Sequence, residues 1–150
     1  MDIRPHRKLE VWKKSMTLAK EIYSATEAFP KSEVYGLTSQ LRRAAVSVPS
    51  NLAEGAARRG SREFKQFINI AQGSLSELDT QLDLAHMLGY LEPVIHEKLM
   101  SEVTDISKML FGLSKSVKKL STNLPQNTEL IEVTYCFKIY FSVLSVSSVV

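Results

Sequence analysis

The sequence predicts an all-α protein, an up-down-up-down antiparallel four-helix bundle followed by a C-terminal tail. Four segments between residues 6 and 120 repeat apolar residues at steps of three and four, the period of an amphipathic helix. The connections between these segments are short, and short connections join antiparallel neighbours. A chain of 150 residues, 44% hydrophobic and 23% charged, is long enough to bury one core. We expect the bundle over residues 1–124 and the tail over residues 125–150.

The first helix is predicted over about His6 to Phe29, and Pro30 ends it because the residue before a proline is pushed out of the helical region. Ser32 is the expected N-cap of the second helix. Glu33 then lies in the first turn, where a carboxylate favours the positive end of the helix dipole. The repeat of the first helix is made by Leu9, Trp12, Met16, Ala19, Ile22, Tyr23 and Thr26, with Trp12 and Phe29 expected in the core.

The second helix, Tyr35 to Arg59, has two apolar flanks. Its core face contains Leu37, Leu41, Ala44, Ala45, Val48, Leu52 and Ala56. A second apolar row, turned by roughly 100° to 140°, contains Val46, Pro49, Ala53 and Ala57. A polar row on the far side contains Gln40, Arg43, Ser47, Ser50, Asn51, Glu54 and Arg58. A small monomer needs one apolar face, so the second flank predicts contact with another subunit. The residues expected at that oligomer interface are Val46, Pro49, Asn51, Ala53, Glu54 and Ala57.

Pro49 is unusual inside a helix. It offers no N–H to the Ala45 carbonyl and its ring crowds that carbonyl, which costs about 3 kcal/mol and bends the axis. One alternative is a break at Val48 and a new helix that starts with Pro49. The freed carbonyl needs another donor, and the candidates are Ser47, Ser50, Asn51 and water.

The third helix has the longest apolar stripe in the chain. Gly60 ends the second helix, and Ser61 is the expected N-cap of the third, with Glu63 in the first turn. Gly73 costs up to about 1 kcal/mol relative to Ala and predicts a close approach of another helix. Gly89 ends the helix. The stripe comprises Phe64, Phe67, Ile68, Ala71, Leu75, Leu78, Leu82, Ala85 and Leu88.

The fourth helix is predicted to start at Glu92 and Pro93, because proline suits the first position of a helix. Its stripe comprises Ile95, Leu99, Val103, Ile106, Leu110, Leu113, Val117 and Leu120. Residues 131–150 are rich in β-branched and aromatic residues, which predicts a disordered or strand-like tail. A membrane anchor is the alternative there, but the serines and Lys138 argue against it, and we expect no membrane partner.

Composition restricts the class of protein. Cys136 is the only cysteine, which excludes an internal disulfide framework, and no Cys/His cluster has the spacing of a zinc finger. The N-terminal stretch lacks the apolar core of a secretory signal, so a cytoplasmic protein is expected. The net charge is +3, and residues 1–60 carry eleven Lys/Arg against six Asp/Glu, which is compatible with an anionic partner.

Basic residues flank both ends of the polar row of the second helix. The candidates for phosphate contact are Arg42, Arg43, Arg58, Arg59, Arg62 and Lys65. If several of them lie on one rim, a ring of subunits would multiply the patch. The alternative is structural: Arg43 and Arg58 pair with Glu54 within or between subunits.

Enzymatic motifs are weak in this sequence. It contains no nucleophile elbow and no glycine-rich phosphate loop. Asp79, Asp83 and His86 share one face of the third helix, but a two-metal bundle site needs a second carboxylate-x-x-His pair. A solvated acidic edge explains them more simply. We expect no metal, no cofactor and no enzymatic activity.

Three stretches resemble a known family, at Leu9 to Ser15 (LEVWKKS), Tyr35 to Gly55 (YGLTSQLRRAAVSVPSNLAEG) and Phe64 to Leu78 (FKQFINIAQGSLSEL). They are similar to the small bacterial four-helix bundle proteins encoded in intervening sequences of 23S ribosomal RNA genes. The likeness covers about residues 6–121 and stops before the tail. It implies the bundle fold, one bent second helix through Pro49, and a homopentameric ring. One branch of relatives assists the reverse transcriptases of diversity-generating retroelements by binding RNA.

Our hypothesis is therefore a self-assembling bundle that binds structured RNA or a nucleic-acid-processing protein, or that associates with the ribosome. The competing hypothesis is a protein–protein adaptor with no role in nucleic-acid binding, because the chain lacks a dense basic face. An enzyme that uses Asp79, Asp83 and His86 is a third and weaker hypothesis.

Overall fold

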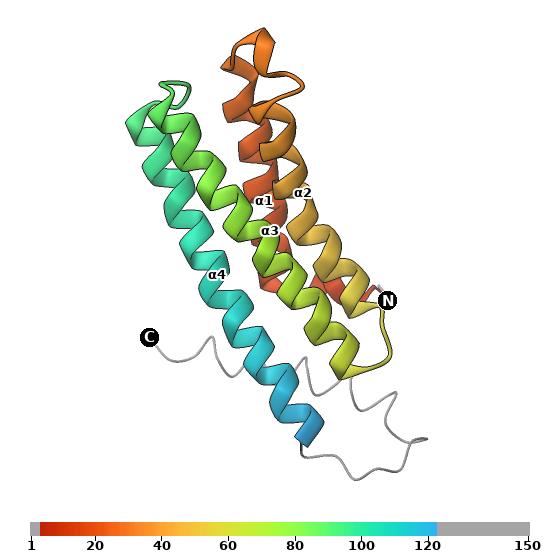
Figure 1. The fold of residues 1–150 in the computed structure, drawn as a ribbon. Helices are drawn as coiled ribbons and strands as arrows, with labels where there is room; N and C mark the ends of the chain where they lie inside the picture. Colours follow the sequence, from red (N-terminus) through yellow and green to blue (C-terminus); the bar gives the residue numbers. More distant parts are fainter. Residues whose placement is uncertain (1–3, 123–150) are drawn as a thin grey trace.

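The computed structural model describes residues 4–122, which form an antiparallel bundle of four helices (Figure 1). The helices are α1 (Glu10–Ala25), α2 (Leu37–Ala56), α3 (Ser61–Met87) and α4 (Pro93–Thr122), and the 3-10 turns are η1 (Pro5–Lys8), η2 (Thr26–Ala28) and η3 (Lys31–Glu33). The α1–α2 and α3–α4 connections lie at one end of the bundle and the α2–α3 turn at the other (Figure 1). The predicted fold class is confirmed. The predicted tail lies outside the described residues.

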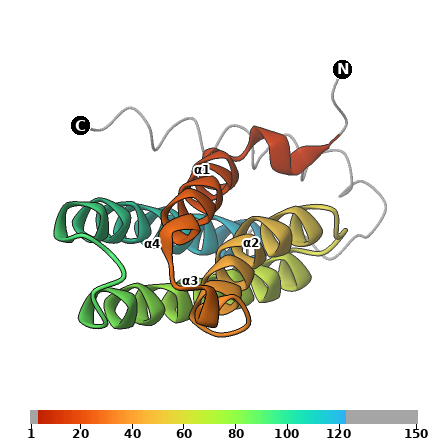
Figure 2. The same cartoon turned by 90° about the horizontal axis from the view of Figure 1, so that it is seen from above.

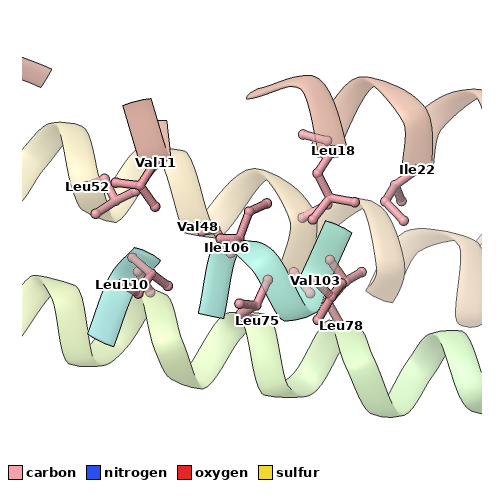
Figure 3. Close-up of a cluster of buried hydrophobic side chains, with 14 of the residues drawn as sticks. Val11, Leu18, Ile22, Val48, Leu52, Leu75, Leu78, Val103, Ile106 and Leu110 are labelled. Atoms are coloured by element: carbon pink, nitrogen blue, oxygen red, sulfur yellow. The ribbon is translucent and has the colours of Figure 1, made fainter. Parts of the chain in front are cut away.

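The core lies along the bundle axis, where all four helices contribute side chains (Figure 3). The side chains labelled there are Val11, Leu18 and Ile22 of α1, Val48 and Leu52 of α2, Leu75 and Leu78 of α3, and Val103, Ile106 and Leu110 of α4. Each fully buried aliphatic side chain stabilises the fold by about 1.5 to 3 kcal/mol. The core stripes are confirmed in the main, but four predicted stripe members are exposed: Met16, Tyr23, Leu88 and Ile95.

The first predicted helix is divided at Leu9. This residue is extended, with φ −82° and ψ 117°, and lies between η1 and α1 with its side chain buried. The helix-like apolar spacing continues through Leu9, which is why the sequence pattern missed the break. The ring of Trp12 lies 5.0 Å from that of His6, across the same break. At the other end α1 stops at Ala25 and continues only as the 3-10 turn η2.

Glu33, and not the predicted Ser32, caps the second helix. Lys31–Glu33 form the turn η3, and α2 begins at Leu37 with Gly36 as its N-cap residue. The Leu37 backbone N–H donates to Glu33 Oε2 at 2.9 Å. The carboxylate therefore satisfies one of the free N–H groups of the first turn from four residues upstream.

One continuous helix runs through Pro49, as the resemblance implies. Two of the candidate donors for the Ala45 carbonyl, Ser50 and Asn51, bond other carbonyls. Ser50 Oγ donates to the Val46 carbonyl at 2.8 Å, and Asn51 Nδ2 donates to the Ser47 carbonyl at 2.8 Å. These side chains bond the carbonyls next along the helix and not that of Ala45.

Glycines set the ends of α3. Gly60 is the N-cap residue, so Ser61 is the first helical residue and not the cap as predicted. At the other end Gly89 has φ +75°, where a side chain would be strained. The Gly89 N–H donates to the His86 carbonyl and the Tyr90 N–H to the Ala85 carbonyl, both at 2.9 Å. This Schellman arrangement confirms that Gly89 ends the helix.

Candidate functional site

Part of the polar row of α2 lies along the junction with α3. The Ser47 and Ser74 hydroxyls are 2.8 Å apart, and Arg43 Nη2 lies 3.6 Å from Glu77 Oε1. Asn51 Nδ2 donates to Ser47 Oγ at 3.0 Å. These three members of the row, of which Asn51 was predicted at the oligomer interface, are therefore used for contacts within the chain.

One strip of the outward face of α2 is made of small and apolar residues, and the exposed Gln40, Arg43 and Glu54 of the same helix lie outside this strip. Ser39, Val46, Ser50 and Ala57 are exposed and Ala53 is half-buried. At 100° per residue these five positions fall within an arc of about 60°. Pro49 does not belong to this face: it is buried within the chain, because it lies closer to the core side of the same helix. Of the predicted interface residues, Val46, Glu54 and Ala57 are exposed and Asn51 and Ala53 are half-buried.

A groove of about 930 Å³ opens where the N-terminal half of α2 meets the C-terminal end of α1 and the turns η2 and η3. We call it the α1–α2 groove. Its charged lining residues are one carboxylate, Glu27, and three cations, Lys31, Arg42 and Arg43. Its complete lining is Tyr23, Thr26, Glu27, Phe29, Lys31, Val34, Thr38, Ser39, Arg42, Arg43, Val46 and Ser47.

Arg42 connects α2 to the end of α1. Its Nε donates to Thr26 Oγ1 at 2.8 Å and its Nη2 to the Tyr23 carbonyl at 3.4 Å. Its guanidinium lies over the Tyr23 ring, 4.7 Å from the centroid. Thr38, one turn earlier on α2, is 6% exposed, and its hydroxyl has no hydrogen-bond partner among residues 4–122. Arg42 therefore stabilises the helix junction, in addition to its place in the groove.

The six predicted phosphate-binding residues form two groups. Arg42 and Arg43 lie at the end with the α1–α2 connection, whereas Arg58, Arg59, Arg62 and Lys65 lie at the α2–α3 turn. Thirteen helical residues, 44–56, lie between Arg43 and the α2–α3 turn, which at 1.5 Å per residue is about 20 Å. No single rim of one protomer holds them all.

The second group contains paired and unpaired cations. Arg58 forms an ion pair with Glu54 and lies 5.2 Å from the centroid of the Phe67 ring. This confirms the predicted pairing of Arg58 with Glu54, within one chain. The predicted partner of Arg43 is wrong, since Arg43 reaches Glu77 across the junction and not Glu54. Within residues 4–122, Arg62 and Lys65 make no ion pair.

Sequence reasoning missed an exposed surface at the α3–α4 connection, which we call the α3–α4 tip. Its apolar members are Leu84, Met87, Leu88, Val94 and Ile95, and its acidic members are Asp83, Glu92 and Glu97. The sequence feature that indicates this exposed apolar surface is two pairs of adjacent apolar residues, Met87 with Leu88 and Val94 with Ile95. Neighbours in a helix point about 100° apart, so one narrow stripe cannot bury both.

Two of the three candidate metal or catalytic residues on α3, Asp83 and His86, contact His96 of α4. His96 Nε2 and Asp83 Oδ1 are 2.8 Å apart, and the His86 and His96 rings stack at 4.4 Å. His86 Nδ1 lies 3.2 Å from the Leu91 carbonyl. No group of three or more His, Cys, Asp or Glu side chains in residues 4–122 is placed to hold a metal ion.

Comparisons with known proteins agree on the fold. A protein of unknown function from the S23 ribosomal protein family of Bacteroides thetaiotaomicron is similar in structure, with a TM-score of 0.65 and 23% identity. The match covers 70% of this chain and 95% of that one. No curated protein matches the sequence. In the part of the chain that the structure describes, no helix is long and apolar enough to span a membrane. The profile of the 23S rRNA-intervening sequence protein family matches residues 7–112, and the chain therefore belongs to that family.

Proposed function

We propose that this protein is a non-enzymatic, cytoplasmic scaffold that self-associates through the outward face of α2 and binds structured RNA. The observation that carries the proposal is the composition of that face, with Ser39, Val46, Ser50, Ala53 and Ala57 at its centre. A helix face that only meets water usually carries charged residues. Small side chains at successive turns leave room for a neighbouring subunit to approach the helix closely.

A ring of subunits would give the RNA-binding surface. A cyclic assembly places the same end of every protomer on the same side, so all α2–α3 turns would gather on one rim. Each turn would contribute Arg58, Arg59, Arg62 and Lys65. Repetition of a modest cationic patch raises the avidity for an extended polyanion. A ring of five copies, as expected from the family resemblance, is our proposal for the assembly.

A protein–protein adaptor is the second candidate, and the contacts of the arginines favour it. Arg42 is bound to Thr26 and Arg43 contacts Gln40 and Glu77, so these guanidiniums already have partners within the chain. Phosphate binding there would have to compete with those contacts. The two candidates share the self-association and differ in the ligand.

Self-association is tested by light scattering on the full-length protein at micromolar concentration. The wild type should form an oligomer, and Ala57→Glu should lower its mass, because a charge would then lie in the interface. Gly73→Glu is the matched control, since Gly73 is exposed on α3 with open space around it. A wild-type protein that stays monomeric would refute the proposal.

RNA binding is tested by titration with structured RNA fragments at two salt concentrations. The affinity should fall steeply as salt rises, because phosphate contacts release counterions. The double variant Arg62→Ala, Lys65→Ala should weaken binding and reduce the salt dependence. Lys20→Ala, an exposed cation on α1, is the matched control. An intact oligomer that binds no RNA at low salt would leave the adaptor as the function.

A further inference from the structure

Two surfaces at the same end of the bundle are complementary in charge. The α3–α4 tip lies within residues 83–97, a segment with the carboxylates Asp83, Glu92 and Glu97 and no Lys or Arg. Its apolar side chains are among the most exposed in the described chain, with Met87 82% and Val94 79% accessible. A surface that is both apolar and acidic fits a partner that is both apolar and basic.

The α1–α2 groove has that opposite character. Its cations outnumber its carboxylates by three to one, and Val34 and Val46 in its lining are 50% and 42% exposed. Lys31 makes no ion pair within residues 4–122. The Arg43 pair with Glu77 is 3.6 Å long and exposed, so it contributes little and can be exchanged. The buried Thr38 hydroxyl, which lacks an acceptor, also lines this groove.

We infer that the α1–α2 groove of one copy binds the α3–α4 tip of a second copy. The inference rests on the proposed self-association and names the surface that α2 meets on its neighbour. Met87 and Val94 of the tip pack against Val34 and Val46 of the groove. The tip carboxylates face the groove cations, with Glu92 and Glu97 toward Lys31 and Arg43. The contact joins two different surfaces, so it is heterologous, head to tail.

The position of the two surfaces allows such a contact to close into a ring. A rotation about an axis moves each atom around that axis and leaves its height along the axis unchanged. Surfaces that meet around a ring must therefore lie at the same height. The α1–α2 connection (orange) and the α3–α4 connection (green) lie at the same end of the bundle and apart from each other (Figures 1 and 2). A ring axis roughly parallel to the bundle meets this condition.

Two full-length variants test the inference, each blocked on one surface. The groove variant carries Val34→Arg and Val46→Arg, and the tip variant carries Met87→Arg and Val94→Arg. All four positions are exposed, so both variants should keep the helical circular dichroism of the wild type. Phe111→Arg, an exposed apolar position on α4 distant from both surfaces in sequence, is the control and should keep the wild-type mass.

Light scattering on the separate and mixed variants gives distinct outcomes. Each variant alone should have the mass of one 16.9 kDa protomer. An equimolar mixture should form pairs of twice that mass and nothing larger, because only one intact groove and one intact tip can meet. A tip variant that keeps the wild-type mass, or blocked variants that stay monomeric when mixed, would overturn the inference and leave self-association through α2 standing. A monomeric wild type would refute both.

Discussion

Gly55 of α2 and Phe67 of α3 approach so closely that a Cβ built on Gly55 would lie 2.6 Å from the Cβ of Phe67. The same Cβ would lie 2.8 Å from Cδ2 of Phe64. Real Cβ atoms do not come this near to a neighbour, so the two helices can pack at this distance only around a glycine. The contact lies just before the α2–α3 turn, where Arg58 stacks on the Phe67 ring. The close approach at Gly55 therefore also positions the α2–α3 turn and its arginines relative to α3.

Gly55→Ala should destabilise the protein. Alanine is a better helix former by about 1 kcal/mol, but the forced separation of α2 and α3 should cost more, so we expect a net loss of about 1 to 3 kcal/mol. Urea denaturation followed by circular dichroism measures the free energy of unfolding. An unchanged or higher midpoint would show that the helices can separate at little cost.

Gly73→Ala should have the opposite effect. Gly73 is exposed inside α3, and a Cβ there would meet no atom within 4 Å. The variant gains helix propensity without a clash, so the free energy of unfolding should rise by up to about 1 kcal/mol. The same urea titration tests it. A loss of stability would mean that the open space around Gly73 is needed, for example by another subunit.

These two glycines show what the sequence could and could not predict. The apolar period identified four helices and most of the core because burial of a stripe depends on local spacing. The period does not say which helix lies opposite a given residue. Gly73 was therefore predicted to be the close approach, and the structure places it at Gly55. The sequence around both glycines is equally helical, and only the packing of α2 on α3 distinguishes them.

The candidate site was predictable in part for the same reason. The outward position of Val46 and Ala57 follows from the helical period alone. The burial of Pro49 depends on how the neighbouring elements cover α2, which the period does not contain. The contact of Arg42 with Thr26 joins residues sixteen positions apart. The sequence alone therefore could not distinguish the structural role of Arg42 from the role of Arg62. Charge counts predict a possible ligand, whereas the pairing of each charge depends on the fold.

Arg42→Met should lower stability by about 1 to 2 kcal/mol. The variant keeps an apolar stem but loses the bonds to Thr26 Oγ1 and the Tyr23 carbonyl, and the cation over the Tyr23 ring. Arg42→Lys should not restore the loss, because an ammonium lacks the planar fork of a guanidinium. Arg62→Met at the exposed α2–α3 turn is the control. Equal midpoints for the Arg42 and Arg62 variants would contradict a structural role for Arg42.

Thr38→Val should stabilise the isolated protein by about 1 kcal/mol. The Thr38 hydroxyl is buried without a hydrogen-bond partner, and a valine of similar shape removes that cost. Thermal unfolding followed by circular dichroism should show a higher midpoint. Ser39→Ala, at the exposed neighbouring position, serves as the control. A lower midpoint for Thr38→Val would show that the hydroxyl has an acceptor in solution.

Glu102→Gln should change how stability depends on pH. Burial of Glu102 and the nearby Glu21 carboxylate raise the pKa of Glu102 above its ordinary value of 4.5. The folded chain therefore binds this proton more tightly than the unfolded chain does. Between pH 4.5 and the raised pKa, the contribution of Glu102 to stability must fall as the pH rises, because the folded chain loses its proton at a cost. Glutamine is neutral throughout this pH range, so its contribution to stability does not fall as the pH rises.

The variant should therefore be at least as stable as the wild type at pH 7, with a difference that shrinks toward pH 4. Urea midpoints measured at intervals between these two values give both curves. Glu63→Gln, which removes one carboxylate at an exposed position near the start of α3, is the control. Lys98 lies 3.9 Å from Glu102 and favours its charged form, but burial and the Glu21 carboxylate have the larger effect on its pKa. A variant that is less stable than the wild type at pH 7, with a deficit that disappears toward pH 4, would mean that Lys98 outweighs burial and that the direction assigned to the pKa of Glu102 is wrong.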